Sequence, residues 1–162
     1  MSAGNTIIEF SPLCCVPPDF GYARFGVRND HPVLYFGHTG TVNESGFFSA
    51  IMPHYYSGRG MNVNIAWSSS TGSIGYCKWN GALERFTGNS DLKTSHFLGI
   101  QSASGEAPAS SGLIQYLNLP MTGIYCTGLL PGELFRFMIQ RDGTQNSMSG
   151  DAELYFLEFK EA

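Results

Sequence analysis

The order of apolar and polar residues along the chain follows a period of two, not the period of a helix. In residues 61–68, Met61, Val63, Ile65 and Trp67 alternate with smaller or polar side chains. Successive side chains of a strand point to opposite faces, so this pattern predicts a strand with one apolar face. A second strand is predicted over residues 73–86, and the two are expected to form an antiparallel hairpin that brings Trp67 and Trp79 to the core.

The same alternation recurs toward the C-terminus. Residues 133–141 place Phe135, Phe137 and Ile139 on one face, and both this stretch and residues 151–160 carry apolar side chains on both parities. Strands that are apolar on both faces lie centrally in a sheet or beneath another subunit. Further strands are predicted at residues 7–10, 33–36, 46–51, 95–101 and 113–119, and helix is expected only at 81–86 or in a turn near Asp91. About eight short strands with turns between them predict an all-β, single-domain sandwich or jelly roll.

The N-terminal segment differs from the rest of the chain. Residues 11–22 show no alternation, contain the pairs Cys14-Cys15 and Pro17-Pro18, and carry one charge. We expect an N-terminal arm and lead-in strand over residues 1–26, followed by the sandwich over 27–162. A free arm of this composition would expose apolar surface, so it should lie over its own core as an edge strand or clamp a neighbouring subunit. The candidate contact residues are Leu13, Cys14, Pro17, Pro18, Phe20 and Tyr22.

Charge limits the classes of partner. Only 14% of the 162 residues are charged, against about 25% in an average domain. The surface is therefore either rich in uncharged polar groups or covered by partners, whose interfaces are depleted in charge. A net charge of −4 with nine Lys and Arg excludes a nucleic-acid binder, because there is no basic run to neutralise phosphates. No apolar stretch reaches the roughly 18 residues of a membrane span, and the first apolar stretch lacks the basic flank of a signal peptide.

No motif indicates catalysis, a cofactor or a metal. The four cysteines (Cys14, Cys15, Cys77 and Cys126) follow no disulfide or zinc-binding spacing and are expected to be buried thiols. The four histidines (His31, His38, His54 and His96) have no metal-site spacing. Motifs of serine nucleophiles and phosphate-binding loops are also absent. The sequence therefore predicts a protein that is not an enzyme.

One loop has two interpretations. Residues 53–60 join a strand to the strand that begins at Met61, and they include Tyr55, Tyr56 and Arg59. The tyrosines could brace the end of the sandwich. Alternatively, adjacent aromatic and basic side chains could stack on a sugar ring or fill a partner's pocket.

The strand endings and turns resemble those of a known group of proteins. The stretches concerned are Pro53-His54-Tyr55-Tyr56, the alternation 61–67, residues 73–85 with Gly75 and Trp79, Pro131-Gly132-Glu133-Leu134-Phe135-Arg136, Arg141-Asp142, and Gly150-Asp151-Ala152-Glu153-Leu154. Over residues 33–160 the chain resembles small jelly-roll proteins of tailed bacteriophages and prophages, among them capsid decoration (cement) proteins. Residues 1–26 have no counterpart in this resemblance.

The resemblance implies a structural role in the virion. On this interpretation the protein is made in the host cytoplasm, assembles as a homotrimer and binds the major capsid protein on the capsid surface, without nucleic acid or membrane. The alternative is a carbohydrate- or receptor-binding module of a phage tail or head fibre, with Tyr55, Tyr56, Trp67 and Trp79 as the candidate aromatic residues. The alternation of residues 61–67 places Trp67 on the apolar face that is expected to point into the core, which argues against that alternative.

Overall fold

The protein is a two-layer β-sandwich. The computed structural model describes residues 4–37, 42–72 and 74–162; Met1, His38 and Ser73 lie outside these ranges. Ten strands are described: β1 (Thr6–Phe10), β2 (Arg24–Arg28), β3 (His31–Phe36), β4 (Glu44–Ile51), β5 (Met61–Ser69), β6 (Tyr76–Phe86), β7 (Gln101–Glu106), β8 (Gln115–Met121), β9 (Leu134–Arg141) and β10 (Ala152–Glu161). Two short 3₁₀ turns, η1 (Pro12–Cys14) and η2 (Gly123–Tyr125), are the helical elements of the described chain. No described helix is long and apolar enough to cross a membrane.

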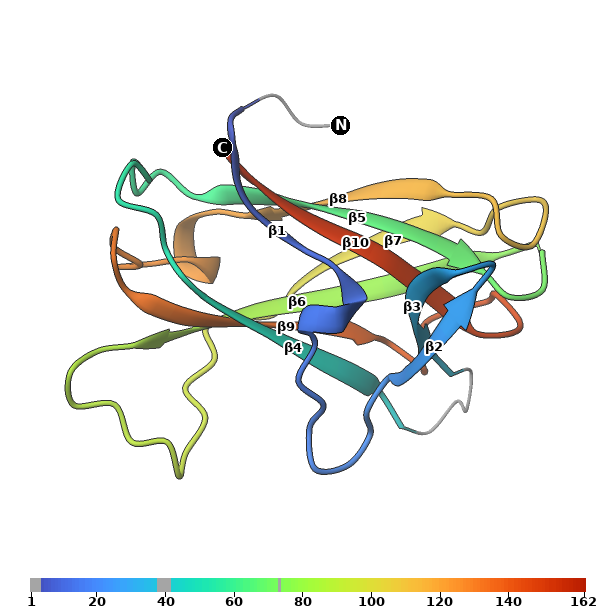
Figure 1. Ribbon diagram of the computed structural model, residues 1–162, viewed down its shortest axis with the longest axis horizontal. Coiled ribbons are helices and arrows are strands. Elements are labelled where there is room, and N and C mark those ends of the chain that lie inside the picture. Colours follow the sequence, from blue (N-terminus) through green and yellow to red (C-terminus); the bar gives the residue numbers. More distant parts are fainter. Residues whose placement is uncertain (1–3, 38–41, 73) are drawn as a thin grey trace.

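The strands form two antiparallel sheets that face each other (Figure 1). Sheet A has the order β2-β3-β10-β5-β8, and β1 pairs with the C-terminal half of β10, beyond the short stretch that pairs with β3. Sheet B has the order β4-β9-β6-β7. The expected all-β sandwich is therefore confirmed.

The core lies between the sheets and is built from the predicted alternation. Trp67 of β5 and Trp79 of β6 are both fully buried, with their rings 6.0 Å apart edge to face. Phe137 of β9 meets Phe159 of β10 in the same way, at 5.0 Å. Aromatic rings that meet edge to face across two sheets bury a large apolar area and add a favourable quadrupole interaction. These contacts fix how the two layers face each other.

The connection between β5 and β6 differs from the prediction. The two strands do not form a hairpin, because β5 pairs with β10 and β8 in sheet A while β6 pairs with β9 and β7 in sheet B. The linking loop crosses from one layer to the other and contains Gly72 and Gly75 at φ values of +52° and +135°. Alternation determines which side chains enter the core, but either topology satisfies it, so the sequence pattern could not separate them.

Three other segments also depart from the prediction. Residues 81–86, a candidate helix, are the second half of β6. The seventh strand begins at Gln101 rather than Ser95, and strand β2 was not predicted. Strand β2 also spans the expected arm boundary at residue 26.

The arm lies along its own sandwich in the single chain. Val16 forms a bridge with Phe47 of β4, and Tyr22 forms one with Ser45, so residues 16–22 follow the free edge of sheet B. Within one chain the arm thus lies beside β4, and its contact with a neighbouring subunit stays a prediction. Leu13 and Phe20 remain mostly exposed.

Candidate functional site

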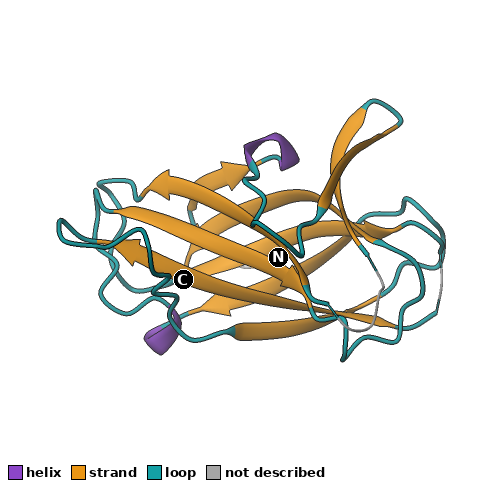
Figure 2. Ribbon diagram, turned by 90° about the horizontal axis from the view of Figure 1, so that it is seen from below, coloured by secondary structure: helices purple, strands orange, loops and turns teal. Residues whose placement is uncertain are grey.

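The hairpin of β2 and β3 rises out of sheet A and forms a wall on its outer face (Figure 2). Among the described residues, only Leu34–Phe36 of β3 pair with β10, so the rest of the hairpin is free to leave the sheet plane. Its two-residue turn, Asn29 and Asp30, has φ values of +46° and +65°. Asn and Asp tolerate this left-handed region better than other residues with side chains, and two such residues give the tight turn typical of hairpins.

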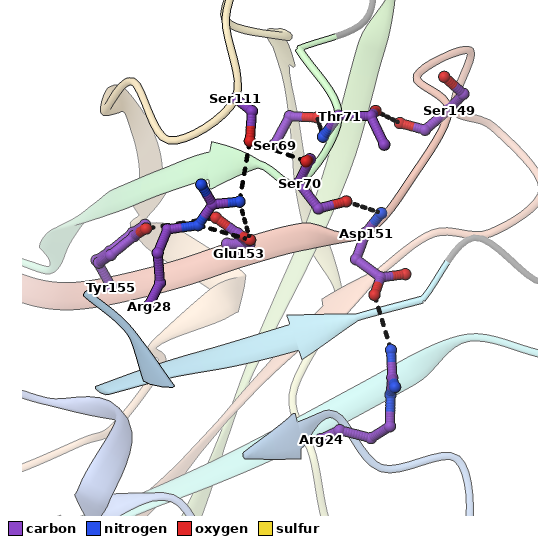
Figure 3. Close-up of polar contacts among 10 residues, drawn as sticks. All are labelled: Arg24, Arg28, Ser69, Ser70, Thr71, Ser111, Ser149, Asp151, Glu153 and Tyr155. Carbon is purple, nitrogen blue, oxygen red and sulfur yellow. Dashed lines mark hydrogen bonds and ion pairs between the residues drawn. The ribbon is translucent and has the colours of Figure 1, made fainter. Parts of the chain in front are cut away.

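Two arginine–carboxylate pairs fasten the wall to the start of β10, and a hydrogen bond from Arg28 ties it to the loop before β8 (Figure 3). Arg28 donates two hydrogen bonds to Glu153, at 3.1 and 2.8 Å, and one to Ser111 at 2.9 Å. Arg24 pairs with Asp151 at 2.7 Å. The Glu153 side chain is fully buried although it lies on the outer face, and its hydrogen bond raises the pKa of Arg28 above its ordinary value. A carboxylate held this far from water needs its cation, so this pair is a fixed part of the fold.

A hollow of about 490 Å³ lies beside the wall. We call it the hairpin hollow; its lining is Arg28, Asn29, His31, Gly112, Ile114 and Tyr155. Burial and the negative charge of Glu153 raise the pKa of Tyr155 to about 12, so its hydroxyl stays protonated and donates to Glu153 at 3.3 Å. The hollow thus combines the apolar side chain of Ile114 and the aromatic ring of Tyr155 with several hydrogen-bonding groups.

A second hollow, of about 240 Å³, lies farther along the same strands. Its floor is Ala66 of β5, which stands in register between Phe156 of β10 and Tyr116 of β8. Tyr116 is 63% exposed and Phe156 is 36% exposed. A small residue between two exposed aromatic side chains leaves a space with an aromatic ring on each side; we call it the Ala66 hollow.

A row of polar side chains borders the Ala66 hollow. In register across four strands it contains Glu9, Glu158, Asn64 and Asn118. Asn118 donates to Asn64 at 3.1 Å, and Asn64 donates to Glu158 at 3.0 Å. Burial acts to raise the pKa of Glu158, but hydrogen bonds from Thr6 and Asn64 and the charge of Lys160 outweigh it, so this pKa lies below its usual range. Glu158 is therefore ionised at neutral pH. The carboxylate and amide oxygens of the row are acceptors, so the row suits a ligand that brings hydroxyl donors.

A bulge in β10 creates this face. The register of β10 against β5 shifts between Leu154 and Phe156. Because of the extra residue, the buried positions change from Ala152 and Leu154 to Leu157 and Phe159. Strict alternation would give Tyr155 the same face as Leu157 and Phe159, so the sequence pattern alone could not show this shift. Bulges redirect side chains in this way at functional edges of sheets.

The outer face of sheet B also carries a polar row and aromatic side chains, but its aromatic rings are covered by one another and by an arginine. Its polar row is hydrogen-bonded from strand to strand and consists of Ser45, Gln140, Asn80 and Ser102. Phe47 and Phe97 stack with centroids 5.8 Å apart, and the Arg136 guanidinium lies over both rings. These rings therefore offer less free surface to a ligand than Tyr116 and Phe156 do.

The residues predicted from the loop 53–60 do not lie at these hollows. Tyr56 is buried and accepts a hydrogen bond from the Gly60 amide at 3.1 Å, while the exposed Tyr55 donates its hydroxyl to the Ile7 carbonyl at 3.2 Å. Arg59 is exposed. Both tyrosines thus brace the end of the sandwich, which is the structural one of the two interpretations.

The predicted arm residues divide into two groups. A mostly apolar hollow of about 510 Å³, the arm hollow, lies between the arm and the hairpin and brings together Leu13, Pro17 and Tyr22. Cys14, Pro18 and Phe20 do not line it. Of the cysteines, Cys77 and Cys126 are buried and Cys14 is exposed. Among the described residues, no three His, Cys, Asp or Glu side chains gather where they could hold a metal ion.

Comparison with known proteins identifies the fold. No family model matches the chain, and no curated protein matches its sequence. Among solved structures, it is similar to the CBM22-1 xylan-binding domain of Paenibacillus barcinonensis Xyn10C, at 10% identity over 100% of this chain and 99% of that one, with a TM-score of 0.52.

Two further structures are similar over nearly their whole length. The family 11 carbohydrate-binding module of Clostridium thermocellum, in complex with a β-1,3-1,4-mixed-linked tetrasaccharide, has a TM-score of 0.50 at 9% identity and covers 100% of this chain and 98% of that one. The mannan-recognising module TmCBM27 has a TM-score of 0.51 at 8% identity and covers 99% and 100%. The fold is therefore that of jelly-roll carbohydrate-binding modules.

Proposed function

We propose that this chain is a carbohydrate-binding module that holds a glycan along the outer face of sheet A. The observation that carries the proposal is the Ala66 hollow, with Phe156 and Tyr116 on its two sides and a row of hydrogen-bond acceptors beside it. A pyranose ring has C–H groups on its faces and hydroxyls around its rim. Aromatic side chains match the faces, and carboxylate and amide oxygens match the rim.

The solved structures support the same class of ligand. Those with similar folds bind xylan, a mixed-linked glucan tetrasaccharide or mannan. These are neutral polymers rich in hydroxyl groups, and the acidic row at Glu9 and Glu158 favours neutral over anionic sugars. The role is binding without catalysis.

The test is titration calorimetry with xylo-, manno- and cello-oligosaccharides of two to six units. Tyr116→Ala and Phe156→Ala should each weaken binding about five- to tenfold, because an aromatic contact of this kind contributes roughly 1–1.4 kcal/mol. Tyr76→Ala is the matched control: Tyr76 is similarly exposed but belongs to sheet B. If the two variants bind like the wild type, the site lies elsewhere. Failure of the wild type to bind any glycan, including on an array, contradicts the proposed function.

A structural role in a virion is a second proposal, and the exposed apolar side chains of the N-terminal region favour it. Leu13 is 70% exposed and Phe20 is 82% exposed, which suits contact with the major capsid protein or with sister subunits of a homotrimer. Because β1 belongs to sheet A, deleting the arm would remove a strand, so Leu13→Ser with Phe20→Ser is the better variant. Light scattering should show a trimer that this double variant loses; a wild type that stays monomeric at high concentration contradicts trimer formation.

A further inference from the structure

The outer face of sheet A is closed at one end and open at the other. At the closed end, Arg28 extends from the hairpin to Ser111, across the strands between them (Figure 3). The Arg28 side chain also lies against Gly112, where an added Cβ would come within 3.0 Å of its guanidinium. The hairpin tip and the loop before β8 therefore meet over the sheet.

The two hollows lie one after the other along the face, and the hairpin hollow is the one next to the closed end. The hairpin hollow contacts Tyr155 of β10 and Ile114, just before β8, and the Ala66 hollow contacts the next outward residues of the same elements, Phe156 and Tyr116. Beyond them the face continues over Asn64 and Asn118 to the ends of the strands, where Pro120 is exposed. A bound chain can leave the site only in this second direction.

The closed end is built to stay closed. Glu153 is fully buried, and its partner Arg28 is about two-thirds buried, with 32% of its side chain exposed. Separating the pair would leave a carboxylate uncompensated away from water, so opening the wall is costly. A neutral sugar chain carries no positive charge that could replace Arg28 beside Glu153, so its binding does not offset the free energy needed to open the wall.

We infer that the site binds the end of a glycan chain rather than an internal segment, with the terminal sugar unit in the hairpin hollow and the next units over the Ala66 hollow and the polar row. Asn29, His31 and Tyr155 supply polar atoms for the hydroxyl that marks a chain end, and Ile114 supplies an apolar surface. This inference rests on the proposed function, and it adds the binding mode.

The test counts binding sites on a polymer. Xylan, mannan and mixed-linked β-glucan are each offered intact and after partial hydrolysis, at equal mass, and the amount of protein bound at saturation is measured. If the protein binds chain ends, this amount rises by the same factor as the number of ends. An amount that stays constant or falls as the chains shorten overturns the inference while leaving carbohydrate binding intact; no binding to any polymer or oligosaccharide overturns both.

A double variant tests the wall directly. Arg28→Ala with Glu153→Gln removes the bridge without leaving a buried charge, and it should make saturation binding follow polymer mass instead of the number of ends. Arg85→Ala with Glu133→Gln is the matched control, because that arginine also donates two hydrogen bonds to its carboxylate, at 3.1 and 2.9 Å, but the pair ties Glu133, just before β9, to sheet B. If this double variant folds and its saturation binding still follows the number of chain ends, the wall is not the reason for end binding and the inference fails. If it does not fold, the wild-type measurement alone decides.

Discussion

The most informative single position for the stability of the fold is Arg141, the last residue of β9. Its side chain is fully buried. It donates hydrogen bonds to the carbonyls of Phe36 at 2.9 Å, Gly150 at 2.7 Å and Met148 at 3.1 Å, and to the side-chain oxygen of Asn146 at 2.8 Å. Burial lowers its pKa, yet a guanidinium stays charged at neutral pH. One side chain thus joins the end of β3 to the loop that leads into β10, where the hairpin wall is rooted.

We expect Arg141→Met to lower the free energy of unfolding by about 3 kcal/mol. Methionine fills similar space, but it leaves three backbone carbonyls without this donor, and each lost partner costs roughly 1–3 kcal/mol. Relief from burying a charge offsets part of that cost, so we take the lower end of the range. For a chain of this size, about 3 kcal/mol corresponds to a fall in Tm of roughly 6–12 °C.

Urea unfolding is the assay, followed by the fluorescence of the buried tryptophans; Trp79 stands in register with Arg141 on the neighbouring strand. Arg59→Met is the control, since Arg59 is exposed and its loss should change stability by less than about 0.5 kcal/mol. If Arg141→Met unfolds within about 1 kcal/mol of the wild type, the guanidinium is not the fastener described here.

Three further outcomes follow from the structure. Ala66→Leu should abolish glycan binding and leave Tm unchanged, because the larger side chain fills the Ala66 hollow on the outer face; retained affinity in titration would contradict the site. Gly81→Ala should destabilise the fold by about 1–3 kcal/mol in urea, because its Cβ would lie 2.4 Å from Leu119, whereas Gly88→Ala, with nothing within 4 Å, should not. Hydrogen bonding to Arg85 lowers the pKa of Glu133 below its usual 4.5, so the ionised Glu133 stabilises the fold above that pH, and this stabilisation is lost as the pH falls through the lower, folded-state pKa. Glu133→Gln should therefore reduce the fall of the urea midpoint with decreasing pH in this range. An unchanged pH dependence would contradict the pairing.

The core was predictable because a two-layer sandwich requires one apolar face on each strand, and alternation in the sequence shows which side chains form that face. Phe135, Phe137 and Ile139 are fully buried, as the pattern over residues 133–141 indicates. Pairing between strands was less predictable, since a strand with one apolar face can join either sheet. For this reason the two tryptophan strands were assigned to the core correctly but to one hairpin wrongly.

The candidate site was harder to predict than the core, because the aromatic residues that were expected to mark it lie elsewhere in the fold. Exposed aromatic residues were sought at Tyr55, Tyr56, Trp67 and Trp79, but the last three are buried. Large aromatic side chains gain most from burial, so their presence in a sequence predicts the core before it predicts a binding surface. For the hairpin, the available signal was Asn29-Asp30, a turn pair flanked by the short alternation of Arg24 to Arg28.

The apolar residues on both parities of β10 bear on the choice between the two proposed functions. The pattern of residues 151–160 suggested a strand covered by another subunit, yet the bulge accounts for it within one chain. Because the register shifts before Phe156, the four apolar positions Ala152, Leu154, Leu157 and Phe159 all face the core. Among the apolar and aromatic side chains of this strand, only Phe156 and the partly buried Tyr155 turn outward. What remains exposed is one aromatic side chain beside a hollow, not an apolar face that a trimer must cover. The argument for self-association therefore moves from β10 to the arm, while the outer face of sheet A keeps the two aromatic side chains and the row of acceptors on which the glycan proposal rests.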